Sequence, residues 1–430
     1  MGQRFKNPWA SFKRPSVNDI FQSISINGCH SEEPFVSPLE RIPETTTANF
    51  KFPKSSPRPR VMWLGHAGVY LQIPRARDDY LTEPIGVLFD PVFSSRCSPV
   101  SFVGPKRRLS PPCRVSQLPA VHLVVISHDH YDHLDKQTIK DIEATHGSTV
   151  QYVVPTGVKS LLVKFGIPQH KIHQLGWWEE TQVYTSDKNT TWTIRESTSS
   201  ETNSLDALSI DKEKELLIEC VQVDNVSTSS ETLIDKRDKI RIICTPAQHN
   251  SGRLSYGKNR TLWATWYLEC SLPGDCFDKY SEPRLWRCFF GGDTGYQSQT
   301  LGPICPIFKE ISDRYGPPDL AFLPIANGSI LPYLSSLLPF ISFDVKRLVS
   351  SLHCLPSHAI DVHRDLRATV TMPIHWGTWM GKKESKCIAR DLRVVCKRMG
   401  VELRWGSLHH QGIGVGDVGV WMEFGQDRSD

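Results

Sequence analysis

The sequence lacks the features that mark membrane-spanning, secreted and nucleic-acid-binding proteins. A membrane span needs roughly 18 consecutive apolar residues, and the nearest candidate, 329–343 (SILPYLSSLLPFISF), is short and interrupted by two prolines. The N-terminal stretch MGQRFKNPWASFKRP has no apolar core of the kind that a secretory signal needs. The net charge of +4 is too small to indicate a nucleic-acid partner. We therefore expect an intracellular, cytoplasmic protein that binds no nucleic acid.

Paired cysteine motifs are also missing. The twelve cysteines show none of the C-x-x-C pairs of a zinc ribbon or a thioredoxin-like site. In a reducing compartment we expect most of them to be buried thiols. Histidine and aspartate are then the residue types that carry the chemical information.

Apolar, β-branched runs alternate with amphipathic segments along most of the chain. The strand candidates are 60–73, 84–92, 121–127, 150–155, 239–246, 262–270, 285–293, 319–325 and 369–376. The helix candidates are 135–147, 159–166, 357–368 and 386–400. Strands interleaved with helices predict a layered α/β architecture.

Two segments depart from this pattern. Residues 1–50 are rich in Pro, Ser and Thr and predict an extended N-terminal arm. Residues from about 185 to 237 are too polar to form a core, which predicts a surface insertion. The remaining pattern predicts one large domain over 51–425.

The stretch VVISHDHYDHLD (124–135) crowds histidines and aspartates behind an apolar strand. His128 and His130 are two residues apart in extended chain, so they point the same way and can share one metal ion. Asp132 and His133 lie past the bend and can serve a second ion, and Asp135 is the expected N-cap of the next helix. The spacing His-x-His-x-Asp-His therefore predicts a metal site.

Four residues cannot complete two metal sites. His249 in TPAQH, Asp293 in FFGGD and His375 in TMPIH each follow an apolar run and are the candidates for the missing ligands. Imidazole and carboxylate without thiolate favour zinc over iron or manganese. The histidines outside these motifs are interpreted as ordinary surface or core residues: His122, His353, His358, His363, His409 and His410.

The order of these motifs resembles that of the metallo-β-lactamase superfamily of hydrolases. Within it, the chain is similar to the N-acylphosphatidylethanolamine-hydrolysing phospholipases D. The similarity runs through RFKNPW (4–9), WLGHAG (63–68), FDPVFSSRCSPVSFVGPKRR (89–108), ISHDHYDHLD (126–135), LGWWEE (175–180), TPAQHNSGR (245–253), GGDTGY (291–296) and PIHWGT (373–378). The resemblance implies a four-layer αββα sandwich.

The resemblance also implies two zinc ions and a role for each ligand. One zinc would be held by His128, His130 and His249, the other by Asp132, His133 and His375, and Asp293 would bridge them. A hydroxide between the ions would attack phosphorus, with Asp132 or Asp293 as catalytic carboxylates orienting it. The products would be an N-acylethanolamine and a phosphatidic acid. A phospholipid substrate implies peripheral membrane association, and a homodimer is compatible with the resemblance.

Several interpretations stay open from the sequence. His66 and Asp90 end strands and can either hydrogen-bond ligand imidazoles or stabilise turns. Tyr131 can contact substrate or pack in the core. The segment 329–343 can form an apolar mouth or a buried element, and the basic segment 386–400 can bind anionic head groups or cover the core. A lactone or a small phosphoester is the alternative substrate.

Overall fold

The protein is described from a computed structural model of the chain. The structure describes residues 4–13, 17–26, 40–50, 58–75, 83–100, 102–184, 193–197, 239–253, 258–272, 284–298, 302–327, 333, 341–343 and 351–425. The polar insertion predicted at 185–237 lies outside these residues except for 193–197. Most of the apolar segment 329–343 also lies outside them.

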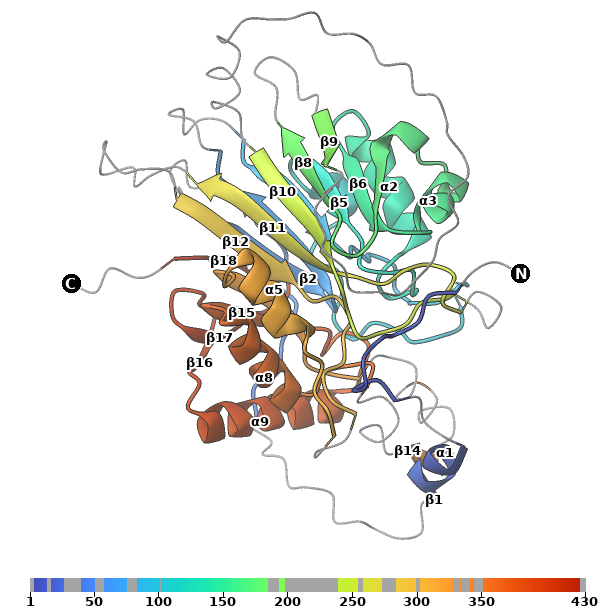
Figure 1. Cartoon of the computed structure of the whole chain (residues 1–430), viewed down its shortest axis with the longest axis vertical. Helices are drawn as coiled ribbons and strands as arrows, with labels where there is room; N and C mark the ends of the chain where they lie inside the picture. The colour runs from blue at the N-terminus through green and yellow to red at the C-terminus, as the bar shows by residue number, and fades with distance from the viewer. Residues whose placement is uncertain are drawn as a thin grey trace, which may run out of the picture.

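Two large sheets form the centre of the molecule (Figure 1). One sheet has seven strands in the order β18-β2-β3-β4-β5-β6-β7. These strands are β2 (Arg60–Gly65), β3 (Gly68–Ile73), β4 (Ile85–Phe89), β5 (Leu123–Val125), β6 (Gln151–Pro155), β7 (Ile172–Leu175) and β18 (Trp421–Glu423).

The other sheet has nine strands in the order β16-β17-β15-β13-β12-β11-β10-β8-β9. They are β8 (Glu180–Tyr184), β9 (Thr193–Ser197), β10 (Lys239–Thr245), β11 (Thr265–Leu272), β12 (Arg284–Phe290), β13 (Leu320–Pro324), β15 (Val370–Ile374), β16 (Leu403–Trp405) and β17 (Gly412–Val415). A separate pair joins β1 (Ile24–Ile26) to β14 (Ile341–Phe343).

Helices cover the outer faces of both sheets (Figure 1). The helices are α1 (Val17–Ser23), α2 (Lys136–His146), α3 (Lys159–Phe165), α5 (Ile307–Tyr315), α8 (Pro356–Leu366) and α9 (Lys382–Met399), with short 3₁₀ turns η1 (Val115–Gln117) and η2 (Gln169–Lys171). α2 and α3 lie on the seven-stranded sheet, and α5, α8 and α9 lie on the nine-stranded sheet. The four-layer αββα arrangement implied by the resemblance is therefore confirmed.

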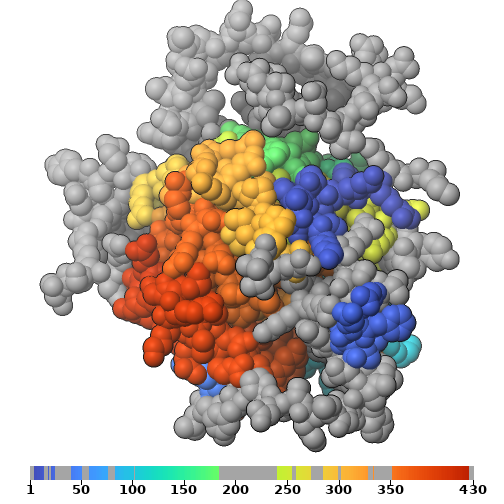
Figure 2. Space-filling view, turned by 60° about the horizontal axis from the view of Figure 1, so that its bottom comes forward, coloured from blue at the N-terminus to red at the C-terminus, as the bar shows by residue number. Residues whose placement is uncertain are grey.

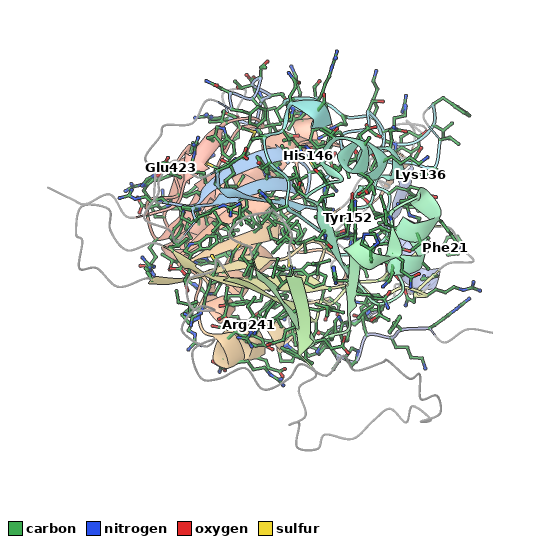
Figure 3. All side chains as sticks on the ribbon, turned by 90° about the horizontal axis from the view of Figure 1, so that it is seen from above. Phe21, Lys136, His146, Tyr152, Arg241 and Glu423 are labelled. Carbon is green, nitrogen blue, oxygen red and sulfur yellow. The ribbon has the colours of Figure 1, made fainter. Side chains whose placement is uncertain are left out.

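The inner strands β2, β4 and β5 of the seven-stranded sheet are buried along their whole length because both of their faces are covered. In β2, Val61 and Trp63 belong to the core between the sheets, whereas Met62 and Leu64 pack toward the helices. The same alternation carries Tyr152 of β6 to the helical side. Figure 3 shows Tyr152 close to Lys136 and His146 of α2 and farther from Arg241 of the other sheet.

The sequence prediction needs a few corrections. The run 60–73 was expected as one strand, but it forms the hairpin β2–β3, because Gly65 (φ 94°) and His66 (φ 54°) turn the chain. The strand expected after the basic helix is β16, whereas the prediction missed α1, α5 and the short strands β1, β7, β8, β9, β14, β17 and β18. The helix expected at 386–400 is α9 and begins four residues earlier. It buries Leu392, Val395 and Cys396, so it covers the core.

Other expectations are confirmed. Asp135 caps α2 by accepting hydrogen bonds from the backbone N–H groups of Gln137 and Thr138. None of the nine described cysteines forms a disulfide, and seven of them are buried. Among the described residues, no helix combines the length and apolarity that crossing a bilayer requires.

Candidate metal centre

The predicted ligands stand where strands of both sheets end. β2, β4 and β5 run in one direction in the first sheet, and β10, β12 and β15 run in one direction in the second. Carboxyl ends of strands that run the same way meet at one edge of a sheet. The residues that follow these ends are His66 (β2), Asp90 (β4), the loop 126–133 (β5), His249 (β10), Asp293 (β12) and His375 (β15).

One group of candidate ligands contains His128, His130, His249 and Asp293. The Nδ1 atom of His130 lies 2.8 Å from Nε2 of His128 and 3.3 Å from Nε2 of His249. One ligand atom from each of the four residues lies within 4.8 Å of the others. The three histidines predicted to share one ion are therefore brought together.

A second group contains Asp132, His133 and His375, joined by His66. Nε2 of His375 is 4.0 Å from the Asp132 carboxylate. Asp293 faces this group as well, with Oδ2 3.2 Å from Nε2 of His133 and Oδ1 2.8 Å from Nε2 of His375. The same carboxylate lies 3.4 Å from Nε2 of His249 in the first group. Asp293 thus occupies the position of the predicted bridge.

Three buried atoms in this cluster have no hydrogen-bond partner among the described residues: Nε2 of His133, Nε2 of His375 and Oδ1 of Asp293. His375 and Asp293 approach to 2.8 Å but not in hydrogen-bond geometry. A buried polar atom without a partner is costly. Converging nitrogen and oxygen lone pairs are what a shared cation would satisfy, so the donor set fits a metal ion. The roles of these residues as ligands stay a prediction.

The outward ring nitrogens of the histidines have their own partners. They are the Asp90 carboxylate for His133 (2.7 Å), the Leu352 carbonyl for His249 (2.9 Å), the Ala326 carbonyl for His375 (3.0 Å) and the Ser127 hydroxyl for His128 (2.9 Å). An Nδ1–H that donates outward leaves the Nε2 lone pair pointing at the cluster. These partners therefore set the tautomer that metal ligation requires.

His66 and Asp90 both contact the cluster. Asp90 is fully buried and accepts hydrogen bonds from the backbone N–H and the hydroxyl of Ser127 as well as from His133. His66 Nε2 lies 3.1 Å from Asp132. His66, Asp90 and His375 all have positive φ, at 54°, 39° and 65°. Non-glycine residues in this region are uncommon, and strained backbone of this kind gathers at functional sites.

Tyr131 lies beside the cluster, half-buried. The Arg253 guanidinium is 4.4 Å from the centre of its ring, and the ring packs against Val92, Cys97 and Trp379. The interpretation of Tyr131 as a packed residue has these contacts in its favour. Its contact with substrate stays a prediction.

His353 was expected to be an ordinary histidine, and this expectation is wrong. Its Nε2 lies 3.2 Å from Oδ2 of Asp293, and His375 stacks at 5.3 Å between ring centroids. Its Nδ1 is buried without a hydrogen-bond partner among the described residues. His353 does not follow an apolar strand, so the strand-end pattern that indicated the other residues could not find it. The neighbouring Leu352 carbonyl, which holds His249, was missed for the same reason.

Two glycines of the GGDTG motif allow the loops of the site to approach one another. A Cβ on Gly292 (φ 49°) would lie 2.6 Å from Cβ of Ser127, and one on Gly295 would lie 2.2 Å from the Ser351 carbonyl oxygen. Both distances are too short for a side chain. The motif therefore holds Asp293 between the loop of His128 and the loop of His353.

The N-terminal strap, residues 4–13, also reaches the site. Asn7 donates a side-chain hydrogen bond of 2.6 Å to the carbonyl of His249, and the Ser11 hydroxyl bonds to the Gln248 side chain. Phe5 donates its backbone N–H to the carbonyl of Asn259. Figure 2 shows the strap in dark blue, lying against a surface formed by later, yellow and orange parts of the chain. The predicted arm is thus in contact with a candidate ligand loop.

The charge states of the cluster suit a cation. Burial, chiefly, keeps the pKa values of His128 and His249 well below the ordinary value, so these rings are neutral. Burial would raise the pKa of Asp293, but the imidazoles of His133, His375 and His353 lower it well below its ordinary value. His133 differs: burial would lower its pKa, but Asp293 and Asp90 raise it well above its ordinary value, so this ring must lose a proton before it can bind a metal ion. Neutral imidazoles and ionised carboxylates are the forms that bind metals.

Comparison with known proteins agrees with this geometry. The sequence profile described as Beta-lactamase superfamily domain matches residues 86–214 and 202–376. The chain therefore belongs to the beta-lactamase superfamily.

Three relatives illustrate the range of similarity. An uncharacterized protein of Mycobacterium tuberculosis is 30% identical over 323 residues, which is 74% of this chain and 59% of that protein. The chain therefore spans about three fifths of the length of that relative. N-acyl-phosphatidylethanolamine-hydrolyzing phospholipase D 1 of Caenorhabditis elegans is 26% identical over 404 residues, 91% of this chain and 85% of that protein. A metallo hydrolase structure from Ignicoccus hospitalis covers 85% of this chain and 98% of its own, at 13% identity and a TM-score of 0.40.

Proposed function

We propose that the protein is a zinc-dependent phosphodiesterase of phospholipase D type that hydrolyses N-acylphosphatidylethanolamine to N-acylethanolamine and phosphatidic acid. The observation that carries the proposal is the Asp293 carboxylate, which faces two groups of histidines with unpartnered inward atoms. The similarity to the C. elegans phospholipase D over 91% of the chain supports the substrate class. A lipid substrate also supports peripheral contact with a membrane.

The proposed ligands divide into two sets. His128, His130 and His249 would hold one zinc, and Asp132, His133 and His375 the other, with Asp293 shared. Two bound dications supply a water of lowered pKa and neutralise charge on the phosphodiester oxygens. The buried position of the ligands excludes bulk water from the reacting group and strengthens these interactions.

The residues around the ligands would position the reaction. Asp90 holds His133 in one tautomer, and His66 holds the Asp132 carboxylate in place by its 3.1 Å contact. His353 is mostly buried, with 13% of its side chain exposed, and its Nε2 lies 3.2 Å from Asp293, so its ring would stand beside a phosphate oxygen or a leaving alkoxide held at the metals. A proton delivered to that alkoxide would release the N-acylethanolamine.

The experiment uses purified full-length protein whose metal content has been measured. We expect phosphatidic acid and N-acylethanolamine from N-acylphosphatidylethanolamine, with about two zinc ions per chain. His130→Ala and Asp293→Asn should each lower the rate by more than about 100-fold. His170→Ala, a change of a histidine on η2 away from the cluster, serves as the matched control.

The outcomes separate the site from the substrate. Protein that holds its metals and leaves the lipid untouched, yet cleaves a lactone or a small phosphoester, would overturn the substrate proposal and keep the metal centre. Protein that binds no divalent metal under conditions where it stays folded would overturn both.

A further inference from the structure

A cationic pocket lies beside the metal centre. The cavity measures about 690 Å³, and its wall contains five basic side chains and one acid. The basic residues are Arg96, Lys106, Arg107, Arg108 and Lys382, and the acid is Glu384. Burial raises the pKa of Glu384 to about 7, so near neutral pH this carboxyl is about half ionised and offsets less than one of the five positive charges. The pocket therefore attracts anions.

Four of the five cations fall into two kinds, and the fifth, Arg96, donates to the Gly104 carbonyl within its own loop. Arg107 and Arg108 are partly buried, and their guanidinium groups donate to backbone carbonyls, for example Arg107 to Leu64 (2.9 Å) and Arg108 to Gly377 (3.0 Å). Lys106 and Lys382 are exposed, and neither forms an ion pair with another described residue. The arginines give the pocket a fixed positive wall, while the lysines are free to bind an external anion.

The loop between two of the pocket residues, Arg96 and Lys106, carries an exposed apolar tip. Arg96 and Lys106 face each other across an antiparallel bridge that closes the loop between them. The loop exposes 41% of Val100, 77% of Phe102 and 48% of Val103. Neighbouring exposed apolar side chains of this size mark an interaction site. The tip and its cationic base thus belong to one hairpin-like loop.

The loop is held in shape by its own hydrogen bonds. The Ser98 hydroxyl donates to the Val103 carbonyl (2.5 Å), and it accepts from the backbone N–H of Val100 (3.2 Å). The backbone N–H of Gly104 donates to the Tyr333 hydroxyl (3.2 Å). These hydrogen bonds hold the loop that exposes the Phe102 side chain to solvent and that begins and ends at basic residues.

The pocket shares a wall with the metal centre. Trp379 lines the pocket, and its ring lies 6.1 Å from the ring of His66, which contacts Asp132. The indole Nε1–H of Trp379 is buried without a hydrogen-bond partner among the described residues. A ligand in the pocket would therefore sit next to the candidate active site without occupying it.

We propose that the loop 96–106 docks this protein on membranes that contain anionic phospholipid, with Phe102 and Val103 inserted among the acyl chains and a lipid phosphate seated at Lys106 and Lys382. Apolar insertion combined with basic residues at head-group height is how peripheral proteins bind such surfaces. The proposal rests on the proposed lipid substrate for its purpose, because docking here places the metal centre beside the membrane. Binding itself is measured without hydrolysis.

The test is co-sedimentation of the full-length protein with vesicles. We expect binding to phosphatidylcholine vesicles that contain phosphatidylglycerol, weak binding to phosphatidylcholine alone, and weaker binding as salt is raised. The double variants Lys106→Ala/Lys382→Ala and Phe102→Ser/Val103→Ser should each reduce binding by about tenfold or more. Thermal unfolding checks that both variants remain folded.

Matched changes on another face serve as controls. Lys164→Ala and Val163→Ser alter an exposed lysine and an exposed valine on α3 and should leave binding unchanged. The proposal would be overturned if either loop variant bound anionic vesicles as well as the wild-type protein does. It would also be overturned if the wild-type protein did not bind anionic vesicles. Protein that binds soluble glycerol phosphate but does not bind the vesicles would identify the pocket as a site for free phosphate. This result would likewise overturn membrane docking.

The result is independent of the reaction. Protein that hydrolyses N-acylphosphatidylethanolamine in detergent micelles but does not bind anionic vesicles would refute the docking surface alone. Protein that binds vesicles through the loop but cleaves no such lipid would refute the proposed substrate alone.

Discussion

Replacing Asp90 with asparagine tests whether the outer hydrogen bonds set the ligand state of the metal centre. Asp90 accepts from the backbone N–H of Ser127 through Oδ1 (2.7 Å) and from His133 Nδ1 through Oδ2 (2.7 Å). In Asp90→Asn one of these oxygens becomes an NH₂ group. If the amide oxygen stays at the fixed Ser127 N–H, the NH₂ group faces His133 Nδ1. His133 must then carry its proton on Nε2, which removes the lone pair aimed at the cluster.

The size of the effect follows from this change of tautomer. Loss of an outer-shell carboxylate costs about 10- to 100-fold in metal affinity or activity. That range corresponds to about 1.4–2.7 kcal/mol. The loss should fall on one of two ions, the one assigned to His133, so chelator competition should show one weakened site and one unchanged site. Hydrolysis should decline with occupancy of the weakened site.

Asp141→Asn is the control, because it makes the same chemical change at a carboxylate that accepts one hydrogen bond, from Gln137 Nε2, on the exposed side of α2. It should bind metal and turn over substrate like the wild-type protein. Two metals bound at wild-type affinity in Asp90→Asn, with full activity, would refute the assignment of Asp90 as the residue that orients His133. A fall in unfolding temperature with unchanged metal binding would assign Asp90 to fold stability instead.

Four further predictions follow from the structure. His353→Ala should lower the rate by about 100-fold or more while metal content stays near two per chain, whereas loss of metal would make His353 a ligand beside Asp293. Asn7→Ala removes one hydrogen bond to the carbonyl of His249, worth about 0.5–1.5 kcal/mol, so chelator titration should show metal affinity reduced by about 2- to 13-fold. Burial lowers the pKa of His122 to about 4, so the unfolded chain binds a proton that the folded chain does not between pH about 6.5 and 4. The free energy of unfolding should therefore decline by up to about 3 kcal/mol as pH falls through this window. In denaturant titrations His122→Asn should lack this contribution, so its free energy of unfolding should decline by about 3 kcal/mol less than that of the wild-type protein. Chelation should lower the free energy of unfolding by about 2.7 kcal/mol relative to metal at 100 times its dissociation constant, and equal stability with and without metal would contradict a metal centre.

The central strands could be predicted from the sequence because both of their faces are buried. β4 and β13 form continuous apolar runs of the length of a strand, and no competing pattern is present in them. β17 is buried but contains two glycines, and β18 is a three-residue edge strand with half-buried residues, so the composition of neither distinguishes it from a loop. The pairing of the strands follows from contacts far apart in sequence, and no local pattern specifies it.

The candidate ligands could be predicted where each follows an apolar strand. His128, His249 and His375 share this signal, because the end of a buried strand is where a side chain can enter a cavity. His353 lies just before α8, in a loop that the fold brings to Asp293, so only the tertiary structure identifies it. The contact of Asn7 with His249 spans 242 residues and is equally invisible to local patterns.

The division of the ligands between the two sheets explains both the success and the failure of the sequence prediction. The seven-stranded sheet contributes His128, His130, Asp132 and His133 through one loop, while the nine-stranded sheet contributes His249, Asp293 and His375 from three strand ends. The first set is contiguous, and its spacing alone indicates metal. The second set acquires meaning only when the sheets pack face to face, because neither sheet alone carries a complete set around Asp293. Residues that hold the second set in place therefore influence the metal centre, and the GGDTG glycines, the Leu352 carbonyl and the N-terminal strap all do so through contacts of the loops that carry Asp293 and His249.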